Sequence, residues 1–313
     1  MTRYFISTPL AFWRSRTPTQ QATTFGLGAV LIWGAYMALA RAGVSGGLTG
    51  FDFAFIRYAV AGVVMLPWLL RHKPLQLAGI GWRRSMALVL CAGPIFIAVG
   101  VGGYAYAPLA HGAVVQPATI VVSTALFAWW MLGDRPTRER LVGMALIVVG
   151  LCLISGPSLW VGDTQTLIGD AMFVGAGLLW AMFTVLAKRW QVSAMAVTAV
   201  LSVLSAVLVL PLYAATQDFS RLASVPAWTL LVQFVVQGLL SGVVAIVFFT
   251  RAAELAGAAR AAIFPALVPA AAIVMGIPIT GELPTPNQWA GLFVVTLGLL
   301  TAIGVVKRWL SRL

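Results

Sequence analysis

Apolar residues fill long runs along this chain, and short polar stretches separate the runs. A helix that crosses a bilayer needs roughly 20 predominantly apolar residues. The runs that meet this requirement are expected near residues 22–41, 51–70, 84–106, 109–132, 138–156, 166–187, 193–215, 227–250, 257–279 and 286–306. The pattern therefore predicts an all-α integral membrane protein with about ten transmembrane helices.

The composition supports a membrane-embedded chain and argues against other classes. Of the 313 residues, 61% are hydrophobic and only 9% are charged, whereas soluble proteins carry about 25% charged residues. The net charge of +12 comes from basic residues in short loops between apolar runs, not from one basic face, so we expect no nucleic-acid partner. Cys91 and Cys152 lie inside apolar runs, which favours neither a disulfide nor a metal site. No cofactor is expected.

The second half of the chain repeats the first. Gly-Asp-Arg-Pro-Thr at 133–137 matches Gly-Glu-Leu-Pro-Thr at 281–285, a shift of 281 − 133 = 148, and residues 31–36 match 178–183 at a shift of 180 − 33 = 147. Repetition at a fixed shift indicates two copies of one structural unit. The predicted organisation is a cytoplasmic tail (1–21), a first five-helix repeat (22–156), a periplasmic linker (157–165), a second five-helix repeat (166–306) and a cytoplasmic tail (307–313).

Positive charge predicts how the chain is oriented. With the N-terminus inside, 17 Lys and Arg residues fall on the inner side and only Arg41 and Arg221 on the outer side. Because positive loops stay cytoplasmic, both termini are predicted to be cytoplasmic. An odd number of helices per repeat makes the second copy enter the membrane from the opposite face. Inverted repeats of this kind are typical of secondary transporters with a substrate site near the midplane.

The chain also resembles a known family. The features that carry the resemblance are the two Gly-x-x-Pro-Thr turns, Gly291 and Gly298, Pro117 and Pro265, and Phe-Ile-Arg-Tyr-Ala-Val-Ala at 55–61. Together they resemble EamA-type transporters of the drug/metabolite transporter superfamily. The resemblance implies an exporter of small metabolites in the bacterial inner membrane, with amino acids, including aromatic ones, as expected substrates. One departure is Asp134, where the pattern usually has Glu.

Aromatic residues near the middle of two matching helices predict a substrate cavity. Trp33 and Tyr36 share one helix face, as do Trp180 and Phe183, because residues three apart are neighbours on a helix. At 1.5 Å per residue, Trp33 and Trp180 lie roughly 16 Å and 20 Å from the starts of their helices. We expect the four side chains to line a central cavity from opposite sides. Simple helix packing is the alternative.

Arg57 is the only charge well inside an apolar run, about 9 Å from the outer end of its helix. A charge in the membrane is costly and indicates function by default, so Arg57 is a candidate for binding a substrate carboxylate. Alternatively it extends to the surface or pairs with Asp52.

Polar residues near the third and fourth helices add further candidates. Tyr104, His111 and Gln116 can orient a zwitterion, although His111 can equally be a solvated loop residue. On the inner side, Arg251, Glu254 and Arg260 are predicted to form an ion-pair cluster.

Two prolines are candidate hinges. Pro117 and Pro265 each remove a backbone hydrogen bond and are expected to kink their helices as alternating gates. Phe264, next to Pro265, joins the candidate substrate-binding residues. Glycines 143, 150, 291 and 298 are expected to permit close helix approach, with the fifth and tenth helices as peripheral supports or the contact of a homodimer.

An enzyme is the main rival class. It would need a general acid/base pair or an activated nucleophile, and Asp170 and Asp218 are expected at helix ends, far apart in sequence. No acid is expected in the middle of a helix to carry a proton. No Gly-x-x-x-x-Gly-Lys-Ser/Thr stretch exists, so ATP hydrolysis is not expected to drive transport. The predicted function is export of amino acids by a secondary transporter that is not an enzyme, with another small metabolite or drug as the alternative substrate.

Overall fold

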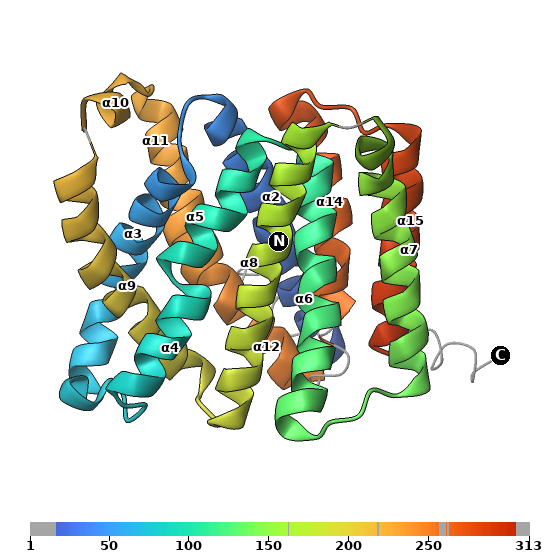
Figure 1. Ribbon diagram of the computed structural model, residues 1–313. Coiled ribbons are helices and arrows are strands. Elements are labelled where there is room, and N and C mark those ends of the chain that lie inside the picture. The colour runs from blue at the N-terminus through green and yellow to red at the C-terminus, as the bar shows by residue number, and fades with distance from the viewer. Residues whose placement is uncertain (1–16, 162, 218, 257–260, 262, 305–313) are drawn as a thin grey trace, which may run out of the picture.

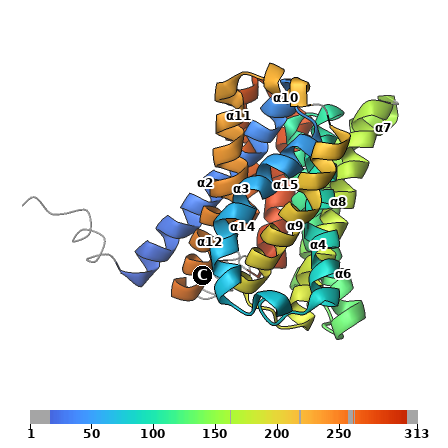
Figure 2. The same cartoon turned by 90° about the vertical axis from the view of Figure 1, so that its left-hand side faces the viewer.

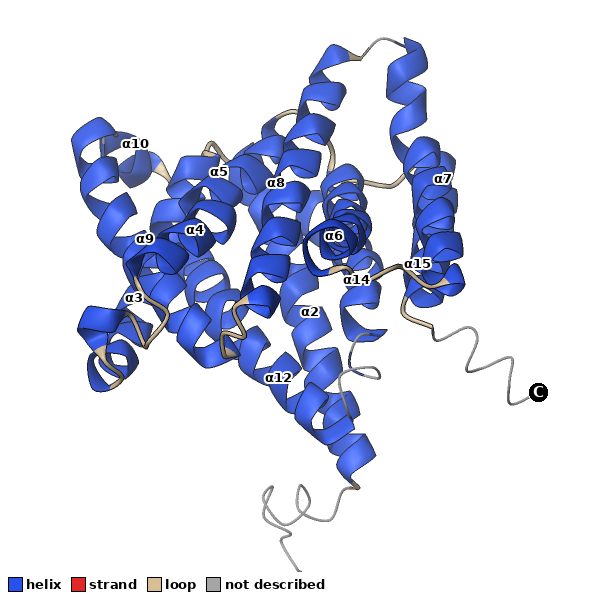
Figure 3. Ribbon diagram, turned by 60° about the horizontal axis from the view of Figure 1, so that its bottom comes forward, coloured by secondary structure: helices blue, strands red, loops and turns tan. Residues whose placement is uncertain are grey.

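The computed structural model describes residues 17–161, 163–217, 219–256, 261 and 263–304. Within these ranges every regular element is helical, and most helices run along one common direction (Figures 1 and 3). The first half contains α2 (Pro18–Ser45), α3 (Gly50–Arg71), η1 (Pro74–Gln76), α4 (Trp82–Ala92), α5 (Pro94–Gly102), η2 (Gly103–Ala105), α6 (Leu109–Leu132) and α7 (Arg138–Val161). The second half contains α8 (Thr164–Arg189), α9 (Ala194–Thr216), α10 (Phe219–Ser224), α11 (Ala227–Gln233), η3 (Phe234–Val244), α12 (Ala245–Ala256), α14 (Ile263–Thr280) and α15 (Pro286–Ala302).

Eight of these helices or consecutive helix runs are long and apolar enough to cross a membrane, counted over the described residues. They correspond to eight of the predicted spans. The remaining two predicted spans, 138–156 and 286–306, coincide with α7 and α15. The prediction of an all-helical membrane protein is therefore confirmed.

Local sequence explains where several helices begin and end. Thr17, Thr49 and Thr285 start α2, α3 and α15 with capping boxes, in which the threonine side chain and a Gln or Asp three residues later bond each other's backbone N–H groups. Gly133 (φ 73°) and Gly281 (φ 72°) follow α6 and α14 in the left-handed conformation, which suits glycine at a helix end. This explains the glycine of both repeated turns.

Two of the predicted spans are interrupted, which the sequence analysis did not foresee. The third span breaks between α4 and α5 at Gly93, because Pro94 lacks the N–H that would continue the α4 hydrogen bonds. The eighth span contains the π-helix η3 between α11 and α12. Each is the third span of its predicted repeat, so both halves have an interrupted helix at the same place.

The helix pairing follows the predicted duplication. α2 packs against α14, and α6 packs against α8; the repeat shift exchanges these two pairs. α3 packs against α9, and α7 packs against α15. In each of these pairs the two helices are each other's counterparts in the repeat. Figure 2 shows α2 crossing the bundle beside α12 and extending beyond it at the N-terminal end. Matching helices of the two halves thus make matching contacts.

α7 and α15 lie together at the periphery of the bundle (Figures 1 and 3). Their contact is built on the spaced glycines: a Cβ on Gly150 would lie 2.9 Å from the carbonyl oxygen of Gly291, and one on Gly291 2.8 Å from that of Gly150. No side chain fits at that separation. The predicted close approach and the peripheral position of these helices are confirmed.

Candidate substrate site between two interrupted helices

Arg57 links three elements inside the bundle. It is half-buried on α3, donates a hydrogen bond from Nη1 to Ser241 Oγ at 3.2 Å, and holds its Cζ 5.8 Å from the ring centre of Tyr36. Among the described residues it forms no ion pair. A guanidinium has five N–H donors, so the contact with Ser241 leaves donors for a carboxylate.

The expected alternative, a pairing of Arg57 with Asp52, does not occur. Asp52 Oδ2 accepts from the backbone N–H of Thr49 at 2.6 Å and from its hydroxyl at 2.8 Å. Asp52 Oδ1 accepts from Tyr213 Oη at 2.6 Å. Asp52 thus starts α3 and ties it to α9, while Arg57 is held by neutral and aromatic groups.

Buried polar side chains lie at the end of α11 and on the following π-helix η3, which Arg57 contacts through Ser241. Gln233 Nε2 donates to the Leu39 carbonyl at 2.8 Å, and Gln237 Nε2 donates to Gln233 Oε1 at 3.0 Å. Gln237 is fully buried, yet its Oε1 has no hydrogen-bond partner. Leaving a buried acceptor unpaired costs about 1–3 kcal/mol, and π-helical segments occur frequently at functional sites. Gln237 can therefore accept a hydrogen bond from a ligand.

The neighbouring residue on α3 reaches the other interruption. Tyr58 donates from Oη to the carbonyl of Ala92 at 2.9 Å, where α4 ends. The hydroxyl of Ser205 on α9 is buried at the same place, 2.9 Å from where a Cβ on Gly93 would lie. Consecutive residues of α3 thus contact both interrupted spans, which is the arrangement that transporters use to build sites from discontinuous helices.

The predicted aromatic residues lie in two groups. Trp33 packs against Phe249 of α12, with ring centres 5.8 Å apart. Trp180 packs against Phe96 of α5 at 4.8 Å and against Phe183 at 5.1 Å. Sequence reasoning missed Phe96 and Phe249, although Phe96 follows Pro94 by two residues. Cavities of about 220 and 370 Å³ lie at the end of the bundle near Glu282 and Tyr106, and none of these aromatic residues lines them.

His111 and Asp170 form a buried pair that the sequence did not indicate. His111 is 3% exposed and its Nδ1 lies 2.9 Å from Asp170 Oδ1, so the alternative that it is a solvated loop residue is wrong. Asp170 is 8% exposed and lies inside α8, and its Oδ2 has no partner. Asp170 is thus in the second turn of α8, close to the helix end at which the sequence analysis expected it.

The remaining candidates are held by packing. The Tyr104 ring lies 5.0 Å from that of Phe173. A Cβ on Gly100 would lie 3.3 Å from Gln116 Oε1, so Gln116 faces α5. Phe264 is buried against α2, where a Cβ on Gly26 would lie 2.2 Å from its ring.

The two prolines are not equivalent. Pro117 lies inside α6, which continues as one helix on both sides of it. Pro265 is the third residue of α14 as its bounds are described, and the gating role of both prolines stays a prediction. Of the predicted inner cluster, Arg251 and Glu254 form an ion pair at 2.8 Å, and Arg260 lies outside the described residues.

Two segments of the chain match one family profile. The profile of the EamA-like transporter family aligns with residues 21–156 and again with residues 167–304. The chain belongs to the EamA-like transporter family. The double match covers most of the sequence and places the family's unit in both halves.

Individual relatives agree with this assignment. An uncharacterized transporter of Archaeoglobus fulgidus is 24% identical over 164 residues, and the match spans 51% of this chain and 55% of that protein. The uncharacterized transporter YwfM of Bacillus subtilis is 26% identical over 262 residues, which is 80% of this chain and 83% of that protein. A solved crystal structure shares the fold, with a TM-score of 0.61 at 17% identity over 92% of this chain and 99% of the other.

Proposed function

We propose that this EamA-family protein is a secondary transporter that exports amino acids, including aromatic and apolar ones, across the bacterial inner membrane. Ten transmembrane helices in two inverted five-helix repeats, with both termini cytoplasmic, would give it a site that opens to either side by alternating access. Family membership and the paired packing of the two halves support this proposal. Homodimerisation through α7 and α15 stays a prediction from the sequence.

The proposal rests on the charge of Arg57, which has no ion-pair partner among the described residues, and on an unpaired acceptor, Gln237 Oε1, on the π-helix that Arg57 contacts. Arg57 lies within a spanning helix and has no acidic partner among the described residues. Gln237 lies four residues, about one turn of the π-helix, before Ser241, and Ser241 is the residue that Arg57 contacts. A zwitterionic amino acid has one group for each: its carboxylate for Arg57 and its ammonium for Gln237 Oε1.

The surroundings favour a substrate with an apolar side chain. The ring of Tyr36 faces the guanidinium of Arg57, and Trp33, three residues earlier, lies on the same face of α2. Apolar walls discriminate weakly among side chains, whereas fixed polar partners discriminate strongly. The arrangement therefore predicts strict recognition of the amino-acid backbone and broad tolerance of its side chain.

Flux measurements in proteoliposomes that hold only this protein test the proposal. Arg57→Gln is expected to reduce uptake of radiolabelled apolar amino acids by about tenfold or more, the value of a lost charged hydrogen bond, while melting temperature in detergent stays close to that of the wild type. Arg251→Gln, which removes an exposed cation, is the matched control.

A second substrate separates binding from folding. Uptake of an amine analogue without a carboxylate should be insensitive to Arg57→Gln. If the wild type moves no amino acid with or without a proton gradient, the proposed substrate class is wrong. If Arg57→Gln instead unfolds the protein and Arg57→Lys does not restore amino-acid uptake, the role of Arg57 as the carboxylate anchor is rejected.

A further inference from the structure

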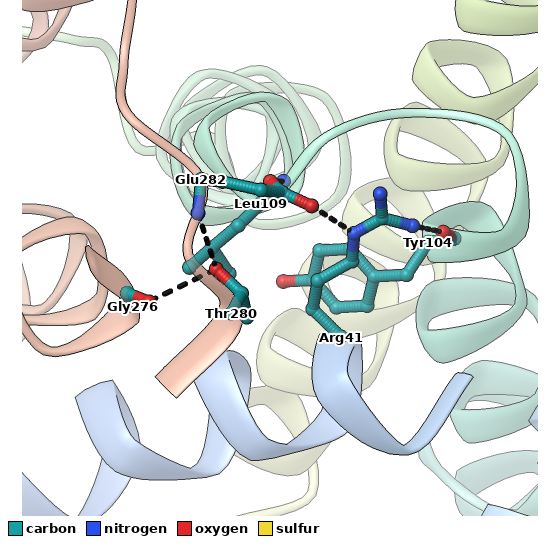
Figure 4. Close-up of polar contacts among 6 residues, drawn as sticks. All are labelled: Arg41, Tyr104, Leu109, Gly276, Thr280 and Glu282. Carbon is teal, nitrogen blue, oxygen red and sulfur yellow. Dashed lines mark hydrogen bonds and ion pairs between the residues drawn. The ribbon is translucent and has the colours of Figure 1, made fainter. Parts of the chain in front are cut away.

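Arg41 is the centre of a polar network that joins four elements at one end of the bundle. Its Nε lies 2.5 Å from Glu282 Oε1, and its Nη1 donates to the carbonyl of Tyr104 (Figure 4). Glu282 Oε2 accepts from the backbone N–H of Leu109 at 2.7 Å. The network thereby connects α2, η2, the start of α6 and the loop between α14 and α15. We name it the Arg41 latch.

Local structure places Glu282 for this contact. Its backbone N–H donates to Thr280 Oγ1 at 3.3 Å, and Thr280 Oγ1 donates to the Gly276 carbonyl at 2.9 Å, which fixes the loop to the last turn of α14 (Figure 4). Leu109 is the first residue of α6. An N-terminal N–H has no partner within its own helix and favours a negative charge, so the carboxylate satisfies both α6 and Arg41.

The repeat predicts a counterpart, and the structure contains it. The shift carries Arg41 onto Lys188 (188 − 41 = 147) and Asp134 onto Glu282 (282 − 134 = 148). Lys188 Nζ lies 2.6 Å from Asp134 Oδ2. This pair, which we name the Lys188 latch, joins the end of α8 to the loop between α6 and α7. Figure 1 shows that loop at the opposite end of the bundle from the loop between α14 and α15.

Both latches join one half of the chain to the other, but they differ in burial. The side chains of Arg41 and Glu282 are 22% and 29% exposed, whereas those of Lys188 and Asp134 are 65% and 48% exposed. Exposed ion pairs contribute little because water and salt screen them. Charged hydrogen bonds shielded from water are stronger. In the described conformation the Arg41–Glu282 ion pair should therefore stabilise its end of the bundle more than the Lys188–Asp134 pair stabilises the other end.

We propose that the two ion pairs are alternating latches, each of which holds one end of the transporter closed and must break before that end opens. The proposal rests on the alternating access proposed above. In the described conformation both latches are formed, and the exposed Lys188 latch is the one that breaks more readily, so we expect the Lys188 end to open first. Exchange of the two halves about the pseudo-two-fold axis would bury the Lys188 latch and expose the Arg41 latch.

Two positions that are buried in the described conformation become accessible only when their own end of the bundle opens. Ala38 lies one helical turn before Arg41 and is fully buried, facing α14. Its counterpart at a shift of 147 is Val185, which is 1% exposed and lies one turn before Lys188. Each would be replaced by Cys in a chain whose Cys91 and Cys152 are changed to Ala. A membrane-impermeant thiol reagent is then applied to each side of proteoliposomes, and the labelling rate is measured.

Arg41→Gln and Glu282→Gln are each expected to raise the labelling rate of Ala38→Cys from the Arg41 side by about tenfold or more, because each removes at least one charged hydrogen bond. The same variants should lower the labelling of Val185→Cys from the Lys188 side. The control replaces both Arg251 and Glu254, an exposed pair within one helix, by Gln, and should change neither rate.

Unchanged labelling of Ala38→Cys in both latch variants would overturn the proposal. Equal increases at both reporters, together with a lower melting temperature, would also overturn it, because the bundle would then have loosened as a whole. The labelling needs no substrate, so an absence of amino-acid flux would reject the proposed substrate and leave the latches standing. Normal flux with unchanged labelling would reject the latches alone.

Discussion

Gly143 of α7 lies against the backbone of Gly298 of α15, and neither position has room for a side chain. A Cβ on Gly143 would lie 2.6 Å from the carbonyl oxygen of Gly298, and a Cβ on Gly298 would lie 2.8 Å from that of Gly143. The repeat shift of 148 turns this pair into Gly291 and Gly150, which make the same reciprocal contact. Matching residues of the two halves thus make the same reciprocal contact.

Gly143→Ala should therefore destabilise the protein by about 1–3 kcal/mol, the usual cost of overpacking. Thermal unfolding in detergent measures the effect. The control is Gly175→Ala in α8, where a Cβ would meet only a Val99 methyl group at 3.9 Å. Equal melting temperatures for the two variants would contradict the tight α7–α15 contact.

The aromatic side chains of α2 and α8 give a prediction about substrate range. Trp33→Ala and Trp180→Ala should reduce transport of bulky apolar amino acids more than that of small polar ones, because large apolar substrates lose more contact area. Competition by a panel of unlabelled amino acids measures the change. Trp130→Ala, at a site that is 78% exposed, is the control. Unfolding of both variants with an unaltered substrate range would assign these residues to packing.

The effects of replacing His111 and Asp170 on stability should not be additive. Asp170→Ala or His111→Ala alone leaves a buried polar group unpaired, which costs about 1–3 kcal/mol. Replacing both residues by Ala should cost less than the sum of the two single changes, since no polar partner is then left behind. A double-mutant cycle on melting temperatures checks this. Additive single and double effects would show that the two side chains do not depend on each other.

Membrane orientation can be tested at the ends of the bundle. In the background without Cys91 and Cys152, Ser45→Cys should react with an impermeant thiol reagent added to intact cells, and Thr137→Cys should react only after the membrane is opened. Both positions are exposed, so accessibility depends on the side of the membrane alone. Reaction of Thr137→Cys in intact cells would invert the predicted topology.

The sequence by itself determined the helical membrane fold, the duplication and the glycine-based helix contact. These features depend on local patterns: apolar runs long enough for a bilayer, a repeat shift that can be counted, and small residues spaced by whole helical turns. The same repeat also relates the two ion pairs that we name latches. The interruption at Gly93 and Pro94 was readable in principle, because proline in a helix interior removes a backbone hydrogen bond.

Only the tertiary structure decided which polar groups meet. Arg57 contacts Ser241, 184 residues away, and His111 contacts Asp170, 59 residues away. A sequence pattern gives the depth of a residue along its helix, but the partner depends on how each helix is rotated and which neighbour it faces. That choice is made by the packing of the whole bundle, because side chains from several helices must fill the same interior at high density.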